Sequence, residues 1–326
     1  MKKRILSGVQ PSGKLHIGNY LGAIKQHLDA QEELSSERFY FIANYHSLTS
    51  LQDKASLIES TMDVARTYLA LGLDPEKSLL FLQTDVPEVC ELSWILSTQT
   101  SMGLLQRCHS YKDKVAKGLT PNHGLFAYPV LMAADILIYD SNVVPVGADQ
   151  KQHVEVTRDL AIRFNHVYGE TLVVPEPLIK EEVAVIPGID GQKMSKSYHN
   201  TIDLFSPKKA LKKQIMAIVT DSKGLEDSKD PETCNVYKLF KFFGSKEEIS
   251  EMARNYRAGG YGYGHAKLEL FGKIDELISP YRDRYEYLKQ HDDEVMDILN
   301  ACGKKARIVA GETMRRVREA TGLIKS

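Results

Sequence analysis

The chain has 326 residues, of which 43% are hydrophobic and 26% are charged, and its formal net charge is −1. These values describe a globular protein with a sizeable core and room for two domains, and no apolar run reaches the ~20 residues that a membrane-spanning helix needs. The four cysteines lack CxxC spacing, which argues against a structural zinc or an iron–sulfur cluster and favours free thiols in a reducing cytoplasm.

The N-terminal part of the chain alternates short β-type runs with helical patterns, which is typical of a parallel sheet covered by helices. The predicted strands cover 4–9, 39–43, 78–82 and 143–146, and the predicted helices cover 18–33, 54–71, 87–99, 125–140 and 149–166. No strand pattern follows Ser206-Pro207, so residues 203–326 are predicted to be helical. The fold class predicted is α/β, a doubly wound parallel sheet with an all-helical C-terminal domain.

Charge is distributed unevenly between the two parts of the chain. Residues 1–200 carry 19 Lys and Arg against 23 Asp and Glu, whereas residues 201–326 carry 23 against 20. The stretch 304–325 holds seven basic residues and two acidic ones. This excess is compatible with a nucleic-acid partner and equally with the solvated face of a C-terminal helix, and both interpretations stay open.

The first predicted strand leads into a motif, PSGKLHIGN, that combines a tight turn with the start of a helix. Gly8 has no Cβ and would let a ligand approach the strand closely. His16 and Asn19 are three residues apart, so they would lie side by side near backbone amides that favour phosphate groups. The alternative is a plain turn with Asn19 as a cap.

A second motif, KMSKS, follows a glycine-containing turn and places Lys193 and Lys196 three residues apart. Such a loop can supply two ammonium groups to a polyphosphate, and cations placed where charge builds up on a leaving group are a strong catalytic device. The alternative is a solvated basic loop. The joint occurrence with the first motif favours the phosphate site.

The helix predicted over 125–140 carries a carboxylate on a face that is otherwise apolar or aromatic. Tyr128, Met132, Asp135 and Tyr139 recur at helical spacing. A buried carboxylate needs a partner. A ligand N–H donor and a partner within the protein core are both consistent with this pattern.

The segment VPVGADQKQH places a strand end directly before a helix start. Asp149 is a good N-cap for that helix. Ligands of open α/β sheets bind at the carboxyl ends of strands, so Asp149 could also bridge ribose hydroxyls, with Gln150 in the same crevice.

Four segments in this order, GVQPSGKLHIGNYLGA, LMAADILIY, VPVGADQKQHVEVTRDLAIRFN and KMSKS, resemble the bacterial tryptophanyl-tRNA synthetases, which are class I aminoacyl-tRNA synthetases. HIGN stands where the wider class has HIGH. The resemblance covers essentially the whole chain and implies a Rossmann-type catalytic domain. It also implies a two-step ligase that forms an aminoacyl-adenylate with ATP and then acylates tRNA.

The resemblance also implies which residues of this chain handle ATP. The catalytic set would be His16, Asn19, Lys193, Lys196 and Lys114. The ATP-binding set would be Gln10, Pro11, Ser12, Gly18, Asn19, Gly147, Ala148, Asp149, Ile186, Lys193, Met194, Ser195, Lys196 and Ser197. Mg²⁺ would arrive with ATP, without a metal site on the protein.

The implied tryptophan site places Asp135 as the acceptor of the indole N–H. The remaining residues of that set would be Gly8, His46, Tyr128, Met132 and Gln150. Two departures from the family pattern concern the pocket wall: Leu6 stands where phenylalanine is common, and the segment 43–46 differs from the usual Val-Asp-Gln-His.

The implied organisation is a catalytic domain over 1–190, the KMSKS loop and a linker over 191–202, a helical anticodon-binding domain over 203–295 and a basic C-terminal helix over 296–326 that packs back on the catalytic domain. Implied partners are tryptophan, ATP, tRNA(Trp) and a second copy of the chain in a homodimer, with no DNA or membrane. The rival interpretations are a tyrosyl-type synthetase, a tRNA-independent nucleotidyltransferase and a non-catalytic paralogue.

Overall fold

The computed structural model describes residues 3–33, 35–108, 122–147, 150–179 and 185–324. Its centre is a five-stranded sheet in which all neighbouring strands are parallel. The order in space is β3-β2-β1-β4-β5, so the chain adds strands first on one side of β1 and then on the other. This is the Rossmann-type, doubly wound arrangement, and the predicted fold class is confirmed. The strands are β1 (Lys3–Val9), β2 (Ser36–Ile42), β3 (Leu79–Leu82), β4 (Val143–Val146) and β5 (Glu176–Ile179).

Helices cover both faces of the sheet, because the side chains of a strand alternate between its faces. Phe39 and Phe41 of β2 belong to one core cluster, which also includes residues of α5, α8, α9 and α14. Tyr40 and Ile42 belong to a second cluster, which includes α4 and continues into the C-terminal helices. These covering helices are α4 (Lys54–Ala70), α5 (Glu88–Ser97), α8 (His123–Leu137), α9 (Lys151–Tyr168) and α14 (Asp292–Thr321).

The sequence patterns did not predict β5. It pairs in parallel with β4 over Glu176–Ile179, at one edge of the sheet. Its sequence, Glu-Pro-Leu-Ile, carries a charge and a proline, which are poor strand formers. An edge strand tolerates proline because one side of its backbone has no ladder to complete.

The predicted helix over 18–33 is divided into shorter pieces. An α-helical turn, α1 (Ile17–Asn19), runs into a π-helical turn, η1 (Tyr20–Ile24), and then into α2 (Lys25–Ala30). Short π-helical turns recur at functional sites. The other short elements of the sheet domain and its following loop are α3 (Asn44–Ser47), η2 (Gln83–Asp85), α6 (Met102–Arg107) and η4 (Lys196–Tyr198).

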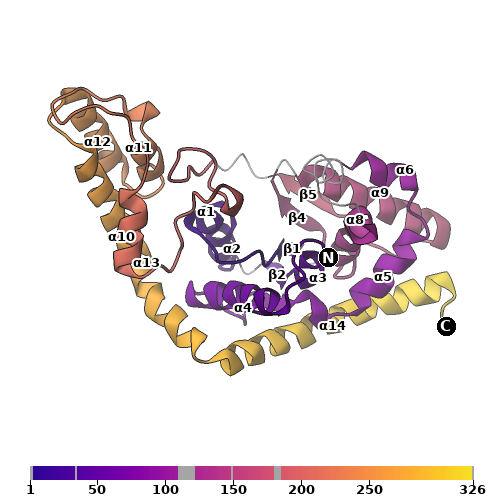
Figure 1. The fold of residues 1–326 in the computed structure, drawn as a ribbon. Helices are drawn as coiled ribbons and strands as arrows, with labels where there is room; N and C mark the ends of the chain where they lie inside the picture. The colour runs from indigo at the N-terminus through magenta and orange to yellow at the C-terminus, as the bar shows by residue number, and fades with distance from the viewer. Residues whose placement is uncertain (1–2, 34, 109–121, 148–149, 180–184, 325–326) are drawn as a thin grey trace.

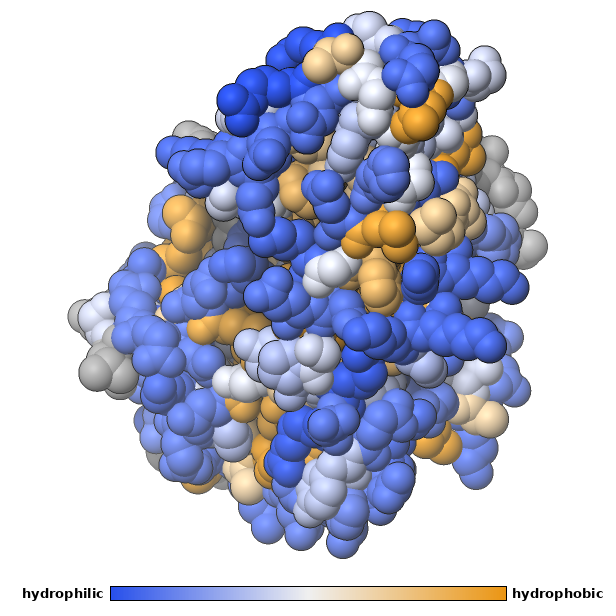
Figure 2. All heavy atoms as spheres, turned by 90° about the vertical axis from the view of Figure 1, so that its left-hand side faces the viewer, coloured by the Kyte–Doolittle hydropathy of each residue, from blue (hydrophilic) through white to orange (hydrophobic). Residues whose placement is uncertain are grey.

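The regular elements that the structure describes after Ser206 are all helices, and the C-terminal third forms a lobe beside the sheet before returning to it (Figure 1). The long helix α13 leads back from the lobe, and α14 then runs beneath the sheet, so that the C-terminus lies near α5. The face that the lobe presents is mostly hydrophilic, with apolar side chains in small patches (Figure 2). These elements are α10 (Lys208–Met216), η5 (Pro231–Thr233), α11 (Asn235–Phe240), α12 (Lys246–Ala258) and α13 (Tyr263–Lys289).

The basic residues of α14 are mostly used within the protein. Of the six that the structure describes in the stretch 304–324, five form ion pairs. Four of these pairs reach acidic residues of the sheet domain, as in Arg316–Asp140 (2.6 Å) and Arg318–Glu91 (2.5 Å). The helix also packs against β3. Most of its described basic residues therefore help to hold the helix against the sheet domain.

Candidate active site

A cavity of about 550 Å³ opens at the carboxyl edge of the sheet between β1 and β4, where the order of the strands reverses. Open α/β sheets bind ligands at this point, because the connections of the two neighbouring strands leave in opposite directions. We call it the switch-point cavity. Its wall includes all six residues predicted to bind the amino acid, namely Gly8, His46, Tyr128, Met132, Asp135 and Gln150.

Asp135 is the acceptor in the wall of this cavity. It lies on α8 with only 1% of its surface exposed. Its carboxylate accepts hydrogen bonds from His46 Nε2 at 2.8 Å and from Gln83 Nε2 at 2.9 and 3.0 Å. Burial raises the pKa of Asp135, and the bonds from His46 and Gln83 oppose this shift. A carboxylate offers about four acceptor positions, so the arrangement leaves capacity for one more N–H donor.

Gln83 is a site residue that the sequence analysis missed. It is fully buried at the start of η2, directly after β3, and its Oε1 accepts a hydrogen bond from the Tyr45 backbone at 3.0 Å. These contacts hold its amide toward Asp135. The signal available in the sequence was a polar side chain directly after a buried strand, at the edge where ligands bind.

The aromatic wall near Gly8 comes from the neighbouring strand. Gly8 of β1 pairs with Phe41 of β2, and a Cβ at Gly8 would lie 2.6 Å from the Phe41 ring. Gly8 therefore makes room for this ring as well as lining the cavity. Leu6, two residues earlier, is buried and also lines the cavity. It stands at the position where phenylalanine is common in the family that the sequence resembles. In this chain Phe41, which lines the same cavity, supplies an aromatic ring close to that position.

A second cavity, of about 630 Å³, is lined by both sequence motifs, and we call it the motif cleft. From the first motif it includes Ser12, His16, Gly18 and Asn19. From the second motif and the residues around it come Ile186, Lys193, Met194, Ser195, Lys196 and Ser197. The structure thus brings together two segments that are more than 170 residues apart in the sequence.

Lys196 joins the two motifs directly. Its Nζ donates to the backbone oxygens of Gly13 at 2.8 Å and Ser12 at 3.1 Å, and it lies 3.4 Å from Ser12 Oγ. Burial lowers the pKa of Lys196, while the carboxylates of Asp63 and Asp203 oppose this shift. The loop that carries the KMSKS motif is therefore closed over the PSG turn, and the ammonium group of Lys196 makes the contact.

His16 is a buried, neutral imidazole. Burial and then the Lys196 cation lower the pKa of His16 to about 4, so it carries no charge at neutral pH. Among the described residues its Nδ1 has no hydrogen-bond partner, and a Cβ at Gly18 would lie 2.9 Å from that atom. Asn19 Oδ1 accepts from the His16 backbone N–H at 3.1 Å. The motif therefore holds an imidazole with an unused polar atom in the cleft wall.

Asn200 organises the second motif and was not predicted. Its Oδ1 accepts from Ser195 N at 2.8 Å, and its Nδ2 donates to Lys193 O at 3.1 Å and to Asp190 Oδ1 at 2.7 Å. A Cβ at Gly188 would lie 2.4 Å from this amide. The loop thus has an internal scaffold of hydrogen bonds, which the lysine and serine pattern of the motif does not indicate.

The remaining predicted positions are distributed as follows. Gln10 and Gly147 line the switch-point cavity, and Pro11, whose carbonyl accepts from Ser47 Oγ at 3.3 Å, connects Gln10 to Ser12 of the motif cleft. The two cavities are therefore neighbours along one turn of chain. Predictions for Lys114, Ala148 and Asp149 fall outside the described residues.

The chain was compared with known protein families and with proteins of known sequence. The family model "tRNA synthetases class I (W and Y)" matches residues 1–279. Over 323 residues the chain is 55% identical to a tryptophan–tRNA ligase of Fusobacterium nucleatum, covering 99% of this chain and 98% of the relative. A Campylobacter jejuni tryptophan–tRNA ligase is 53% identical, with 98% and 100% covered.

Solved structures agree with the sequence relatives. The crystal structure of a Campylobacter jejuni tryptophanyl-tRNA synthetase complexed with ADP and tryptophan has a TM-score of 0.93 at 53% identity, covering 98% of this chain and 99% of that one. An Archaeoglobus fulgidus tyrosyl-tRNA synthetase, at 19% identity and a TM-score of 0.66, shares the fold. The chain belongs to the class I tRNA synthetases of the tryptophan and tyrosine family.

Proposed function

We propose that this protein is a tryptophan–tRNA ligase. It activates L-tryptophan with ATP to tryptophanyl-adenylate and diphosphate, and it then transfers the tryptophanyl group to the 3′ end of tRNA(Trp). The observation that carries the proposal is the pair of neighbouring cavities, one with a buried acceptor at Asp135 and the other lined by His16 and Lys196. The full-length relatives named above support the same activity.

Asp135 explains the choice of amino acid. The indole N–H of tryptophan donates to the carboxylate, which His46 and Gln83 hold in place. Phenylalanine brings no donor, so its binding would desolvate the acceptor without compensation. A site built around a required hydrogen bond rejects an analogue lacking the donor by roughly 10⁴- to 10⁵-fold.

The motif cleft serves the phosphate chemistry. A carboxylate oxygen of tryptophan attacks the α-phosphorus of ATP, the bond from that phosphorus to the bridging oxygen breaks, and diphosphate leaves with the electron pair. Lys193 and Lys196 neutralise the charge that builds up on the leaving group, and His16 contributes a hydrogen bond. Mg²⁺ enters with ATP as part of the substrate.

The helical lobe is proposed to bind tRNA. Residues 1–190 form the catalytic domain, 191–202 the KMSKS loop and linker, 203–295 the anticodon-binding domain and 296–326 the C-terminal helix. Helix α10 carries four lysines, at 208, 209, 212 and 213, and its lobe has a hydrophilic face (Figure 2). Such a surface suits a phosphate backbone.

The working unit is proposed to be a homodimer in the cytoplasm. Trp94 on α5 and Met102 on α6 are 72% and 63% exposed, which is unusual for such large apolar side chains and suits a protein interface. The four cysteines are free thiols, as expected in a reducing compartment. No helix in the described ranges is long and apolar enough to cross a membrane.

The decisive experiment is amino-acid-dependent exchange of labelled diphosphate into ATP, followed by acylation of tRNA. We expect exchange with tryptophan and transfer to tRNA(Trp). Exchange with tyrosine instead would indicate a tyrosyl-type enzyme. Exchange without acylation would indicate a tRNA-independent nucleotidyltransferase, and no exchange with any amino acid would indicate a non-catalytic paralogue.

A further inference from the structure

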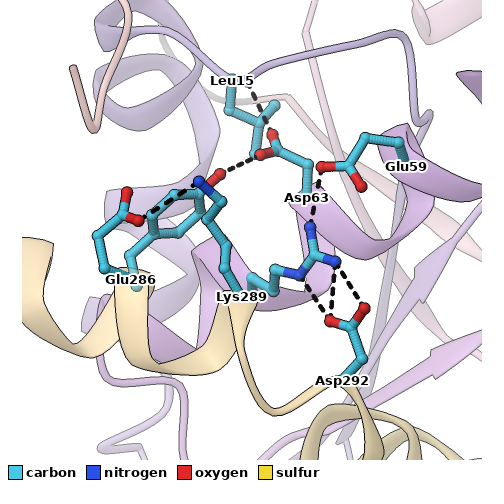
Figure 3. A network of polar contacts seen from close by, with 8 residues as sticks. Leu15, Glu59, Asp63, Glu286, Lys289 and Asp292 are labelled. Carbon is cyan, nitrogen blue, oxygen red and sulfur yellow. Dashed lines mark hydrogen bonds and ion pairs between the residues drawn. The ribbon is translucent and has the colours of Figure 1, made fainter.

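A buried carboxylate outside both cavities connects the first motif to the C-terminal helices. Asp63 lies in the middle of α4 and is 4% exposed. Its Oδ2 accepts a hydrogen bond from the backbone N–H of Leu15 at 3.3 Å, and its Oδ1 accepts one from the hydroxyl of Tyr285 on α13 (Figure 3). One side chain therefore joins segments 48 and 222 residues away in the sequence.

The Leu15 end of this connection lies at the active site, because the next residue is His16. The backbone from Leu15 to Ile17 is also held from the side of the second motif. Ile17 N donates to Ile202 O at 2.9 Å, and Leu204 N donates to Leu15 O at 3.2 Å. Asp63 thus supports the short segment on which the position of the imidazole depends.

The Tyr285 end is anchored in the helical region. Its ring stacks on Phe205 with centroids 4.3 Å apart, and only 7% of the residue is exposed. Burial and the bond to Asp63 raise the pKa of Tyr285, so the phenol remains a donor at neutral pH. The ring packing fixes where the hydroxyl points, and the hydroxyl in turn orients the carboxylate.

A second contact of α4, with α14 in place of α13, does not reach the active site. Arg66, further along α4, donates from Nη2 to both oxygens of Asp292 at 2.8 and 3.0 Å and from Nε to Oδ1 at 3.0 Å (Figure 3). This pair fastens the first turn of α14 to α4 and contacts neither motif. A substitution of Arg66 therefore serves as a control: it should affect stability without the effect on activity that a positioning role of Asp63 would have.

We propose that Asp63 is a positioning residue for adenylate formation, and that through it Tyr285 of α13 sets the placement of the His16 segment. This inference deepens the function proposed above and rests on it. Burial lowers the pKa of Lys196, and the Asp63 carboxylate opposes this shift by favouring the charged form of the lysine. The same residue therefore acts on the backbone before His16 and on the cation that closes the motif cleft.

The experiment compares five full-length variants in tryptophan-dependent diphosphate exchange: Asp63→Asn, Tyr285→Phe, the double variant and the two controls Tyr287→Phe and Arg66→Met. Tyr287 lies on the same helix, is 41% exposed and has its hydroxyl bonded to Glu294. All assays are run below the lowest melting temperature of the set. Thermal unfolding of all five variants records the purely structural effect.

We expect Asp63→Asn to lower kcat roughly 10- to 100-fold, since small displacements of positioned groups have effects of this size. The KM for tryptophan should stay the same, because Asp135 lies in the other cavity. Tyr285→Phe should lower kcat by a smaller factor, and the double variant should be no slower than Asp63→Asn, since both changes remove one connection. Tyr287→Phe should match the wild type, and Arg66→Met should lower the melting temperature without the fall in kcat.

Two further measurements separate positioning from general loosening. The alkaline limb of the kcat profile should move to lower pH in Asp63→Asn, because Lys196 loses the carboxylate that favours its charge. Hydrogen exchange at the Leu15 amide should accelerate in both Asp63→Asn and Tyr285→Phe, and not in Tyr287→Phe. This last readout does not depend on enzymatic activity.

The outcomes are distinguishable. Unchanged kcat in Asp63→Asn and Tyr285→Phe would overturn the inference, as would a loss in the double variant that multiplies the two single losses. A loss confined to melting temperature or to the KM for tryptophan would assign Asp63 a structural role only. Absence of exchange in the wild type would instead overturn the proposed function, while the Leu15 amide would still report whether the connection exists.

Discussion

At the scale of single residues, burial and the surrounding partners act in opposite directions on the pKa values of the titratable groups of the site. Burial raises the pKa of Asp135 and lowers that of Lys196, so in both cases it favours the neutral form. Hydrogen bonds from His46 and Gln83 oppose the shift at Asp135, and nearby carboxylates oppose it at Lys196. At His16 the Asp203 carboxylate also opposes the shift, but burial and the Lys196 cation lower the pKa to about 4, so the imidazole is neutral at pH 7. Acceptor, cation and neutral imidazole are therefore consequences of their surroundings.

Replacing Asp135 by asparagine tests the acceptor. The amide has one acceptor oxygen, whereas His46, Gln83 and the indole N–H all donate toward this position. We expect discrimination of tryptophan over phenylalanine, measured as the ratio of kcat/KM in diphosphate exchange, to fall roughly 100-fold. The KM for ATP serves as the internal control and should not change. An unaltered ratio would show that selectivity arises elsewhere.

His16 provides a test by pH. Its pKa is lowered from 6.5 to about 4 in the folded protein, so between these values only the unfolded chain binds the proton. The free energy of unfolding should therefore fall as the pH falls from 6.5 toward 4, with a contribution from His16 of up to about 2–3 kcal/mol. Urea unfolding at pH 7 and 4.5 should show a smaller loss in His16→Gln than in the wild type. Equal losses would mean that His16 is not held neutral.

At the scale of elements, α14 shows how a long helix is placed by a few close contacts. A Cβ at Gly303 would lie 2.7 Å from the Asp85 side chain, which itself accepts from Leu82 N at 3.0 Å. Gly311, two turns further on, has open space around it. The close approach at Gly303 lets the helix lie against the turn that carries Gln83, so packing of the C-terminal helix supports the active site.

The two glycines form a matched pair of substitutions. Gly311→Ala should raise the free energy of unfolding by roughly 0.5–1 kcal/mol, since alanine is the better helix former. Gly303→Ala gains the same propensity but forces apart α14 and η2, and should cost about 1–3 kcal/mol, the range for overpacking. Chemical denaturation of both variants measures the difference. A stabilised Gly303→Ala would show that the helix can shift without cost.

At the scale of the whole molecule, the sheet domain and the helical lobe meet around the first motif. Residues 202–204 pair with residues 15–17, and α13 reaches Asp63 from the other side. The chain then returns along α14, which forms ion pairs with residues of the sheet domain. The lobe that we propose to bind tRNA and the motif cleft therefore share one structural junction.

The proposed homodimer is tested at Trp94. Trp94→Asp places a charge on an apolar surface that would be buried between copies, so we expect it to shift sedimentation toward the monomer. Ile162→Asp on α9, where the side chain is 52% exposed, is the matched control and should leave the dimer intact. A wild type that sediments as a monomer would contradict the proposal.

The sequence was sufficient for those features that depend on neighbours along the chain. The alternation of strands and helices, the two motifs and the carboxylate on the face of α8 are local patterns, since helix and strand periods can be counted directly. The resemblance carried by these segments led to the family, which the comparisons confirm. The strand β5 was not predicted, because its residues follow no strand pattern and it is formed by pairing with β4.

Contacts between distant segments could be known only from the folded chain. The grouping of Gln83 and His46 around Asp135 depends on strand order, and so does the pairing of Gly8 with Phe41. The bonds from Lys196 to the first motif and from Tyr285 to Asp63 join residues about 180 to 220 positions apart. No local period encodes such distances, because they follow from how helices pack on the sheet. Local patterns and the resemblance thus predicted the candidate groups, and tertiary packing brings them together.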